Sequence, residues 1–192
     1  MPRAIVIWGG WPGHQPEATA HRTAAILTGE GFEALVTDDL EMYASPEIHS
    51  ADLLVPIMTF GEMSNETAEN LSEAVRGGLG LAGFHGGLSA GFPECYAYHY
   101  LTGVTFVAHP GDIVDYRVRV TRPNDPLVAG IPDFDYRSEQ YYVHFDPSVD
   151  VLAVTTFTGE HDPVTRNVDM PVVYKRQFGA GRVFFSALGH AP

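Results

Sequence analysis

The stretch "LGLAGFHGG" (residues 79–87) runs from a short apolar segment into a histidine enclosed by glycines. The apolar segment 79–84 is typical of a strand covered on both faces of a parallel sheet. Residues 83–87 have the form G-x-H-x-G, the spacing of a nucleophile elbow between a strand and a helix. Glycines two positions before and two after His85 let that strand and helix approach closely. We therefore expect His85 in a strained, exposed conformation.

Strands and helices alternate on the N-terminal side of this stretch. Continuous apolar runs predict buried strands at 4–8, 32–39 and 50–58. Apolar residues at helical spacing predict helices at 17–30 and 64–78, the second with Ser64 as its N-cap. This order, joined by right-handed crossovers, favours a doubly wound, mainly parallel α/β sheet.

The pattern changes after residue 100, where short links rich in Asp, Pro and Gly separate further apolar or alternating runs. Because this pattern of short runs and turn-rich links is typical of β-sheet proteins, we expect a strand-rich second half. No linker, repeat or low-complexity tract divides the chain, so residues 1–192 are predicted to form a single α/β domain. The predicted strands of this half are 115–123, 138–145, 150–157, 170–177 and 182–188.

The composition limits the classes of molecule that the protein could bind and the cellular compartment that suits it. Eleven Lys and Arg residues against 24 Asp and Glu give a net charge of −13, which repels nucleic acid and anionic membranes alike. Cys95 is the single cysteine, so no intramolecular disulfide forms and the chain suits a reducing compartment. The first apolar run, 4–8, is too short for a signal peptide or a membrane span. We expect a cytoplasmic protein that acts on a neutral or cationic small molecule.

His85 indicates which chemistry the elbow can perform. In an open α/β sheet, ligands bind beyond the carboxyl ends of the strands, so residues 8–13, 58–62 and 84–87 should share one rim. An imidazole carries protons or binds metals there, but it is a poor substitute for a thiolate. Cys95 lacks an elbow signature and is expected to be a buried structural residue, which disfavours glutamine amidotransferase chemistry. The alternative is that His85 only fills the turn, with its nitrogens bonded to backbone.

Other polar residues are candidates for the same rim. His14 and His190 follow the first and last predicted strands, and His109 is either a turn residue or a pocket wall. Glu139 lies among aromatic residues at the start of a predicted strand, where partial burial would raise its pKa toward that of a useful acid or base. No local metal motif occurs, so a metal site would be assembled from distant residues. The candidates for it are His14, His85, Glu139 and His190, while Trp8, Trp11 and Tyr141 offer apolar faces to a sugar.

Several segments together resemble one known family. They are "GGWPGHQPE" (9–17), "GLGLAGFHGG" (78–87), "FVAHPGD" (106–112), "NDPLVAGIPDFDYRSEQYY" (124–142) and "MPVVYKRQFGAGRVFFSALGH" (170–190). In this order they resemble the ThuA-like family, named for trehalose utilisation. The resemblance implies a flavodoxin-like sheet related to class I glutamine amidotransferases, with an elbow that has lost its cysteine. It also places pocket roles on His14, His85, His109, Glu139, Tyr141 and His190.

This resemblance implies an enzyme of sugar catabolism that acts on a keto-sugar or keto-glycoside, as an isomerase or as a hydrolase or lyase. We expect His85 and Glu139 to be catalytic, by acid–base or metal-assisted chemistry with Zn²⁺ or Mn²⁺, in a homo-oligomer. The alternative is a non-catalytic carbohydrate-binding or assembly module. The sequence departs from the family in two places. Ser138 replaces the usual aspartate before Glu139, and the chain stops at Pro192 where relatives continue with a helical segment.

Overall fold

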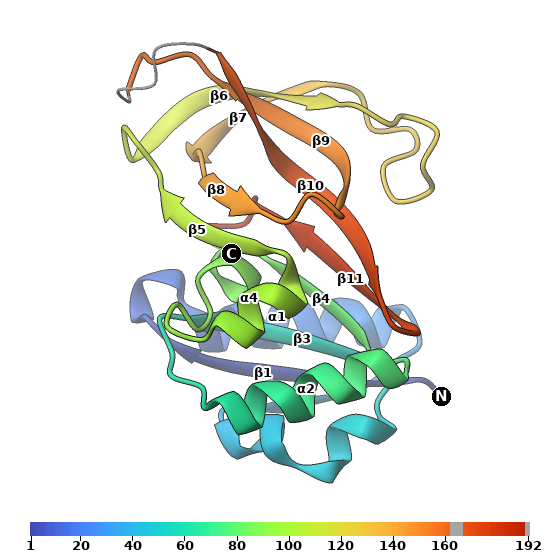
Figure 1. The fold of residues 1–192 in the computed structure, drawn as a ribbon. Helices are drawn as coiled ribbons and strands as arrows, with labels where there is room; N and C mark the ends of the chain where they lie inside the picture. Colours follow the sequence, from blue (N-terminus) through green and yellow to red (C-terminus); the bar gives the residue numbers. More distant parts are fainter. Residues whose placement is uncertain (162–166, 191–192) are drawn as a thin grey trace.

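The computed structural model describes residues 1–161 and 167–190, so the chain end at Pro192 lies outside the described part. Within it, nine strands form one sheet in the order β2-β1-β3-β4-β11-β10-β9-β6-β7 (Figure 1). The strands from β2 to β11 are parallel to their neighbours, and those from β11 to β7 are antiparallel. The expected α/β fold with a strand-rich second half is confirmed.

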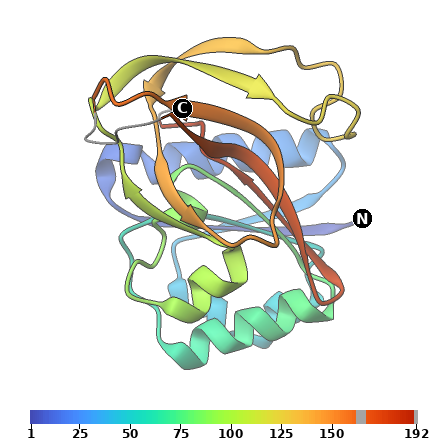
Figure 2. The ribbon, with the colours of Figure 1, turned by 45° about the horizontal axis from the view of Figure 1, so that its top comes forward.

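The parallel half of the sheet, β1 to β4, is covered on both faces. Helices α1 and α2 lie on opposite sides of it (Figure 2). Ile5 and Ile7 of β1 belong to the core that includes Leu71 of α2, whereas Val6 packs with Ala20 of α1. Successive residues of β1 thus face opposite cores, which explains its uninterrupted apolar run. The elements are β1 (Arg3–Gly10), α1 (Pro16–Gly29), β2 (Glu33–Thr37), β3 (Leu53–Thr59), α2 (Asn65–Gly77) and β4 (Gly80–Phe84).

Both predicted helices form close to their expected limits. Ser64 is the N-cap of α2, and its Oγ accepts a hydrogen bond of 3.0 Å from the backbone N–H of Thr67. This bond satisfies one of the free N–H groups of the first turn.

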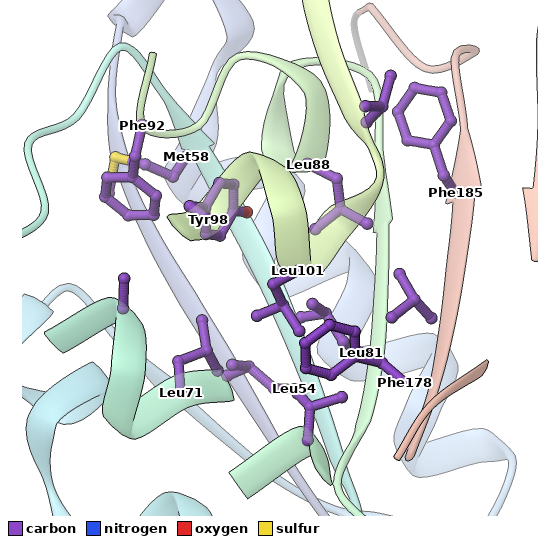
Figure 3. Close-up of a cluster of buried hydrophobic side chains, with 14 of the residues drawn as sticks. Leu54, Met58, Leu71, Leu81, Leu88, Phe92, Tyr98, Leu101, Phe178 and Phe185 are labelled. Atoms are coloured by element: carbon purple, nitrogen blue, oxygen red, sulfur yellow. The ribbon is translucent and has the colours of Figure 1, made fainter. Parts of the chain in front are cut away.

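The main core lies over one face of the sheet, where Leu54 and Leu81 pack beneath Leu101 (Figure 3). Among the described residues, no helix combines the length and apolarity that a membrane crossing requires.

The antiparallel half, formed by β11, β10, β9, β6 and β7, extends the same sheet, and β5 pairs with β8 as a separate ribbon. Figure 1 places this ribbon above the parallel strands, close to β10. The elements are α3 (Gly86–Ser89), α4 (Tyr96–Thr102), β5 (Val104–Ala108), β6 (Ile113–Val120), β7 (Phe134–Glu139), β8 (Tyr142–Phe145), β9 (Asp150–Phe157), β10 (Val168–Phe178) and β11 (Gly181–Ser186). Short 3₁₀ helices occupy Pro12–His14, Leu40–Ala44 and Pro46–Ser50.

The prediction of one strand at 138–145 is wrong. The chain leaves the large sheet after Glu139 and enters the β5–β8 ribbon at Tyr142. Glu139 therefore ends a strand instead of beginning one. Gln140, at the crossover, is buried and donates its side-chain N–H to Thr155 Oγ1 at 2.7 Å, which fixes the chain between the two sheets.

Candidate functional site

The elbow at His85 has the predicted backbone strain. Its φ of 50° and ψ of −129° lie in a region that side chains rarely adopt, between the end of β4 and the start of α3. A Cβ on Gly83 would lie 2.5 Å from Leu88, and one on Gly87 would lie 2.3 Å from the backbone oxygen of Pro56. The two glycines thus permit the close approach that the sequence predicted. The expected exposure of His85 is wrong, because the antiparallel half covers the ring and leaves the residue 2% exposed.

Two contacts hold the imidazole of His85 in one orientation. Its Nδ1 lies 3.0 Å from the backbone oxygen of Ala187, which only accepts, so Nδ1 carries a hydrogen. The ring of Tyr141 stacks on His85 with centroids 4.2 Å apart, and the Tyr141 hydroxyl lies 2.7 Å from His85 Nε2. The hydrogen-bond direction therefore leaves Nε2 as the atom that faces the other polar side chains.

Glu139 meets His85 at this nitrogen. Its Oε2 lies 2.9 Å from His85 Nε2 and 3.2 Å from His190 Nδ1. Burial by itself would raise the pKa of Glu139, but the hydrogen bond from His85 and the charges of the surrounding imidazoles lower it to about 2. The expectation of a raised pKa is therefore wrong, and Glu139 is ionised at neutral pH.

His14 and His190 complete the cluster from opposite ends of the chain. His14 ends the 3₁₀ helix after β1, and its Nδ1 is hydrogen-bonded to Thr59 Oγ1 at 2.9 Å. Burial, followed by the neighbouring imidazoles of His85 and His190, lowers the pKa of His14 to about 4, so the ring is neutral near pH 7. His190 follows β11 and keeps 26% of its side chain exposed.

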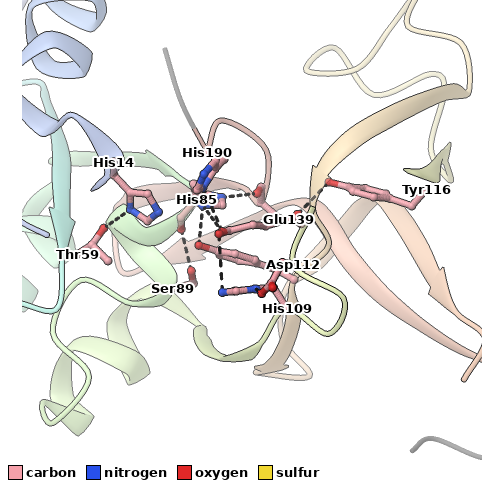
Figure 4. A network of polar contacts seen from close by, with 11 residues as sticks. His14, Thr59, His85, Ser89, His109, Asp112, Tyr116, Glu139 and His190 are labelled. Carbon is pink, nitrogen blue, oxygen red and sulfur yellow. Dashed lines mark hydrogen bonds and ion pairs between the residues drawn. The ribbon is translucent and has the colours of Figure 1, made fainter. Parts of the chain in front are cut away.

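Ligand atoms of His14, His85, Glu139 and His190 all lie within 4.8 Å of one another. Figure 4 shows these side chains pointing toward one another from four separate parts of the chain. Three are imidazoles and one is a carboxylate, so the cluster can share a proton or hold a divalent cation. The structure therefore brings together the four residues that the sequence proposed for a metal site; their chemical roles stay predictions.

The remaining predicted residues surround this cluster. His109 follows β5, is 33% exposed at its side chain, and has Nε2 3.7 Å from Glu139 Oε1. Trp11 is 46% exposed and meets His14 edge-on with ring centroids 4.8 Å apart. Tyr141 is 4% exposed, and its ring lies 4.2 Å from His85 on one side and 4.7 Å from Phe106. Tyr141 therefore holds His85 in place and has no free face for a sugar.

Three supporting groups were not identified from the sequence. Thr59 orients His14, the carbonyl of Ala187 orients His85, and Tyr116 donates its hydroxyl to the backbone oxygen of Glu139 at 3.2 Å. Thr59 lies in the segment 58–62 that was expected at the rim, so its position at the carboxyl end of β3 was the available signal. A backbone carbonyl and a tyrosine in an alternating strand carry no such signal. Cys95 is buried in the main core, as expected.

The family model ThuA, described as trehalose utilisation, matches residues 3–192. The chain belongs to the ThuA family. This assignment agrees with the histidine elbow and with the sheet order, and it places the protein in the class I glutamine amidotransferase-like superfamily. No curated protein matches the sequence.

Solved structures of ThuA-like proteins share this fold. A putative ThuA-like protein from Parabacteroides merdae is 18% identical with a TM-score of 0.80, over 100% of this chain and 81% of its own. One from Bacteroides uniformis is 16% identical with a TM-score of 0.72, over 99% and 82%. The β-galactosidase of Bacillus circulans is 11% identical with a TM-score of 0.62, over 98% of this chain but 28% of the enzyme. At these identities the likeness concerns the fold alone.

Proposed function

We propose that this ThuA-family protein is an enzyme of sugar catabolism that removes a proton from the carbon next to the carbonyl group of a keto-sugar. The observation that carries the proposal is the convergence of three imidazoles and the Glu139 carboxylate within 4.8 Å. Such groups move protons and stabilise charge on oxygen. The elbow presents an imidazole where relatives in the superfamily use a thiol, which disfavours a covalent acyl intermediate. The description of the family as trehalose utilisation supports a sugar as the substrate class.

His109 is the group that we assign to accept the proton. Its half-buried ring is accessible from outside, and its Nε2 lies 3.7 Å from Glu139 Oε1. Because Glu139 is ionised, it stabilises the imidazolium that forms when His109 takes up a proton. His85 is buried and contacts Glu139 Oε2 at 2.9 Å, so its role is to position the carboxylate and to complete the cluster.

The chemistry balances for both outcomes expected from the sequence. Removing the proton leaves the C–H bonding electrons in an enolate, with negative charge on the former carbonyl oxygen. Returning the proton to the former carbonyl carbon, while the hydroxyl proton of the deprotonated carbon moves to the former carbonyl oxygen, gives an isomerised sugar with its carbonyl on the neighbouring carbon. Alternatively, the enolate re-forms the carbonyl and expels the oxygen substituent of the carbon on the far side of the deprotonated carbon. The leaving oxygen takes the bonding electrons, and His109 gives its proton to that oxygen. Isomerase and lyase activity therefore share their first step.

A hollow of about 260 Å³ lies over β6 and β9, and Tyr116, Arg119 and Gln140 line part of it. Its volume is slightly below the range of about 300–1,000 Å³ that is usual for small-molecule sites. Its polar lining supplies hydrogen-bond partners for hydroxyl groups. Tyr116 connects it to the cluster, since its hydroxyl bonds to the backbone oxygen of Glu139.

Hydrogen exchange tests the shared first step. Keto derivatives of trehalose and of a simple glucoside are incubated with the protein in D₂O and followed by NMR. We expect deuterium to replace the hydrogen next to the carbonyl. Rates should fall by about 100-fold or more for His109→Ala and for Glu139→Gln, because proton transfer supplies about 10²- to 10⁴-fold of catalysis.

His144→Ala is the matched control, because His144 is an exposed imidazole on β8 outside the cluster, and it should retain the wild-type rate. Thermal unfolding would verify that each variant is folded. Binding of the keto-sugar to the wild-type protein without exchange or product would overturn the proposal. That result would support the alternative, a carbohydrate-binding module.

A further inference from the structure

We propose that the cluster is a binding site for one divalent transition-metal ion, Zn²⁺ or Mn²⁺. The ligand atoms are Nε2 of His14, Nε2 of His85, Nδ1 of His190 and Oε2 of Glu139. Metal binding at this site is independent of the sugar chemistry, whereas the part that the ion plays in turnover rests on the proposed function.

Nε2 of His85 has more close neighbours than one hydrogen can satisfy. Because Nδ1 donates to Ala187, a neutral ring has a lone pair on Nε2. Around that atom lie the Tyr141 hydroxyl at 2.7 Å, Glu139 Oε2 at 2.9 Å and His190 Nδ1 at 3.3 Å. The carboxylate only accepts, so it is paired with Nε2 either when that nitrogen carries a second proton or when a cation lies between the two atoms. A proton on Nε2 would pair His85 with the carboxylate alone, while a metal ion would bind the carboxylate and the imidazoles of His85 and His190 together.

The spacing of the ligand atoms fits a metal coordination shell. Three of them form a triangle with edges of 2.9 Å, 3.2 Å and 3.3 Å. With metal–ligand bonds of about 2.0–2.2 Å, adjacent ligands of a tetrahedral or octahedral ion lie about 3.0–3.5 Å apart. The triangle thus matches one face of such a shell. His14 lies within the same 4.8 Å group and supplies the fourth position.

Hydrogen bonds outside the cluster orient the ligands as they do in metal sites. Metal-bound histidines usually donate their other ring N–H to a carbonyl, a carboxylate or a similar acceptor. Nδ1 of His85 donates to the carbonyl of Ala187, and Nδ1 of His14 lies 2.9 Å from Thr59 Oγ1. Both rings thereby direct Nε2 into the cluster.

The donor set indicates the kind of ion. Imidazole suits Zn²⁺ and other transition metals, whereas Mg²⁺ and Ca²⁺ prefer oxygen ligands, so three imidazoles with one carboxylate favour Zn²⁺ or Mn²⁺. His14 and His190 are only partly buried, which leaves one side of the cluster open to a substrate oxygen. When bound there, the ion would polarise the carbonyl of a keto-sugar and stabilise the enolate that forms when His109 removes the proton.

Metal titration tests the site without requiring turnover. Metal-free protein is prepared with a chelator, titrated calorimetrically with Zn²⁺, Mn²⁺ and Mg²⁺, and analysed for bound metal after dialysis. We expect about one Zn²⁺ or Mn²⁺ per chain, and at least about tenfold weaker binding of Mg²⁺. His14→Ala and His190→Ala each remove a ligand and should weaken binding by about 100-fold or more. Thr59→Val removes only the partner of His14 and should weaken it by about tenfold.

His144→Ala is again the control and should bind metal as the wild type does. Thermal unfolding of each metal-free variant separates loss of a ligand from loss of the fold, and Thr59→Val remains informative if an alanine variant does not fold. Absence of Zn²⁺ and Mn²⁺ binding to the wild type would overturn this site. So would His14→Ala and His190→Ala variants that bind the metal as tightly as the wild type does. Metal binding without sugar exchange would reject only the proposed function, and full exchange in metal-free protein would reject only the role of the ion.

Discussion

The parallel and antiparallel halves of the sheet contribute to the site in different ways. The parallel half places His14 and His85 just beyond the carboxyl ends of β1 and β4, where such folds bind ligands. The antiparallel half adds Glu139 at the end of β7 and His190 after β11, and it covers the elbow. The comparison shows that the first half sets the elbow geometry, while the second half converts an exposed histidine into part of a buried polar cluster.

The largest expected effect concerns the close packing of the parallel half. Gly87→Ala would place a Cβ 2.3 Å from the backbone oxygen of Pro56, and a backbone atom can move only if β3 shifts. We expect a loss of about 3 kcal/mol in the free energy of unfolding, at the upper end for overpacking. Urea unfolding followed by circular dichroism measures it.

Gly77→Ala is the matched control for this substitution. No atom of the described residues lies within 4 Å of the added methyl group at the end of α2, and helices prefer alanine to glycine. We expect a gain of about 0.5–1 kcal/mol. Equal unfolding midpoints for the two variants would show that the elbow relaxes easily, and that the glycine is not needed for the approach of strand and helix.

The same contrast explains how much the sequence could predict. The strands and helices of the parallel half could be predicted because each has a strong local pattern, such as the uninterrupted apolar run of β1 and the Ser64 cap of α2. The glycine spacing around His85 likewise predicted the strained turn. These features depend on neighbours in the sequence, which is why they could be recognised without the structure.

Features that arise between distant segments could not be predicted in this way. No glycine or proline marks the division of 138–145 into two strands, and the change of sheet depends on the buried contact of Gln140 with Thr155. The burial of His85 depends on the cover from the antiparallel half. The low pKa of Glu139 depends on imidazoles brought from other strands, which oppose the effect of burial.

An intermediate effect on stability is expected from removing the hydroxyl groups of two buried tyrosines, Tyr174 and Tyr43. Tyr174 of β10 is 0% exposed and donates its hydroxyl to the backbone oxygen of Thr102 at 2.6 Å. Tyr174→Phe removes this bond, so we expect a loss of about 1–3 kcal/mol in the free energy of unfolding. The hydroxyl of Tyr43 is also buried but has no hydrogen-bond partner among the described residues. Tyr43→Phe should therefore be neutral or stabilise by about 1 kcal/mol. Unfolding midpoints that fall equally in both variants would contradict this distinction.

The smallest expected effect is the pH dependence that the junction of the two halves introduces. The pKa of His14 falls from 6.5 to about 4 on folding, so between these values the unfolded chain takes up a proton that the folded chain does not. Stability is therefore lost as the pH falls from about 6.5 to about 4. Because the ring is only half-buried and solvent screens its charge, we expect a contribution of about 1 kcal/mol.

Comparison with His14→Asn isolates this contribution. Unfolding is measured in chelator, so that no metal competes for the imidazole, between pH 7 and pH 4.5. The lower limit of pH 4.5 matters because folding lowers the pKa of Glu139 from 4.5 to about 2. The stability that ionised Glu139 contributes is therefore lost mainly below pH 4.5. The wild-type protein should lose more stability than the variant across this interval, whereas parallel pH profiles would mean that the antiparallel half does not bury His14 enough to prevent its protonation.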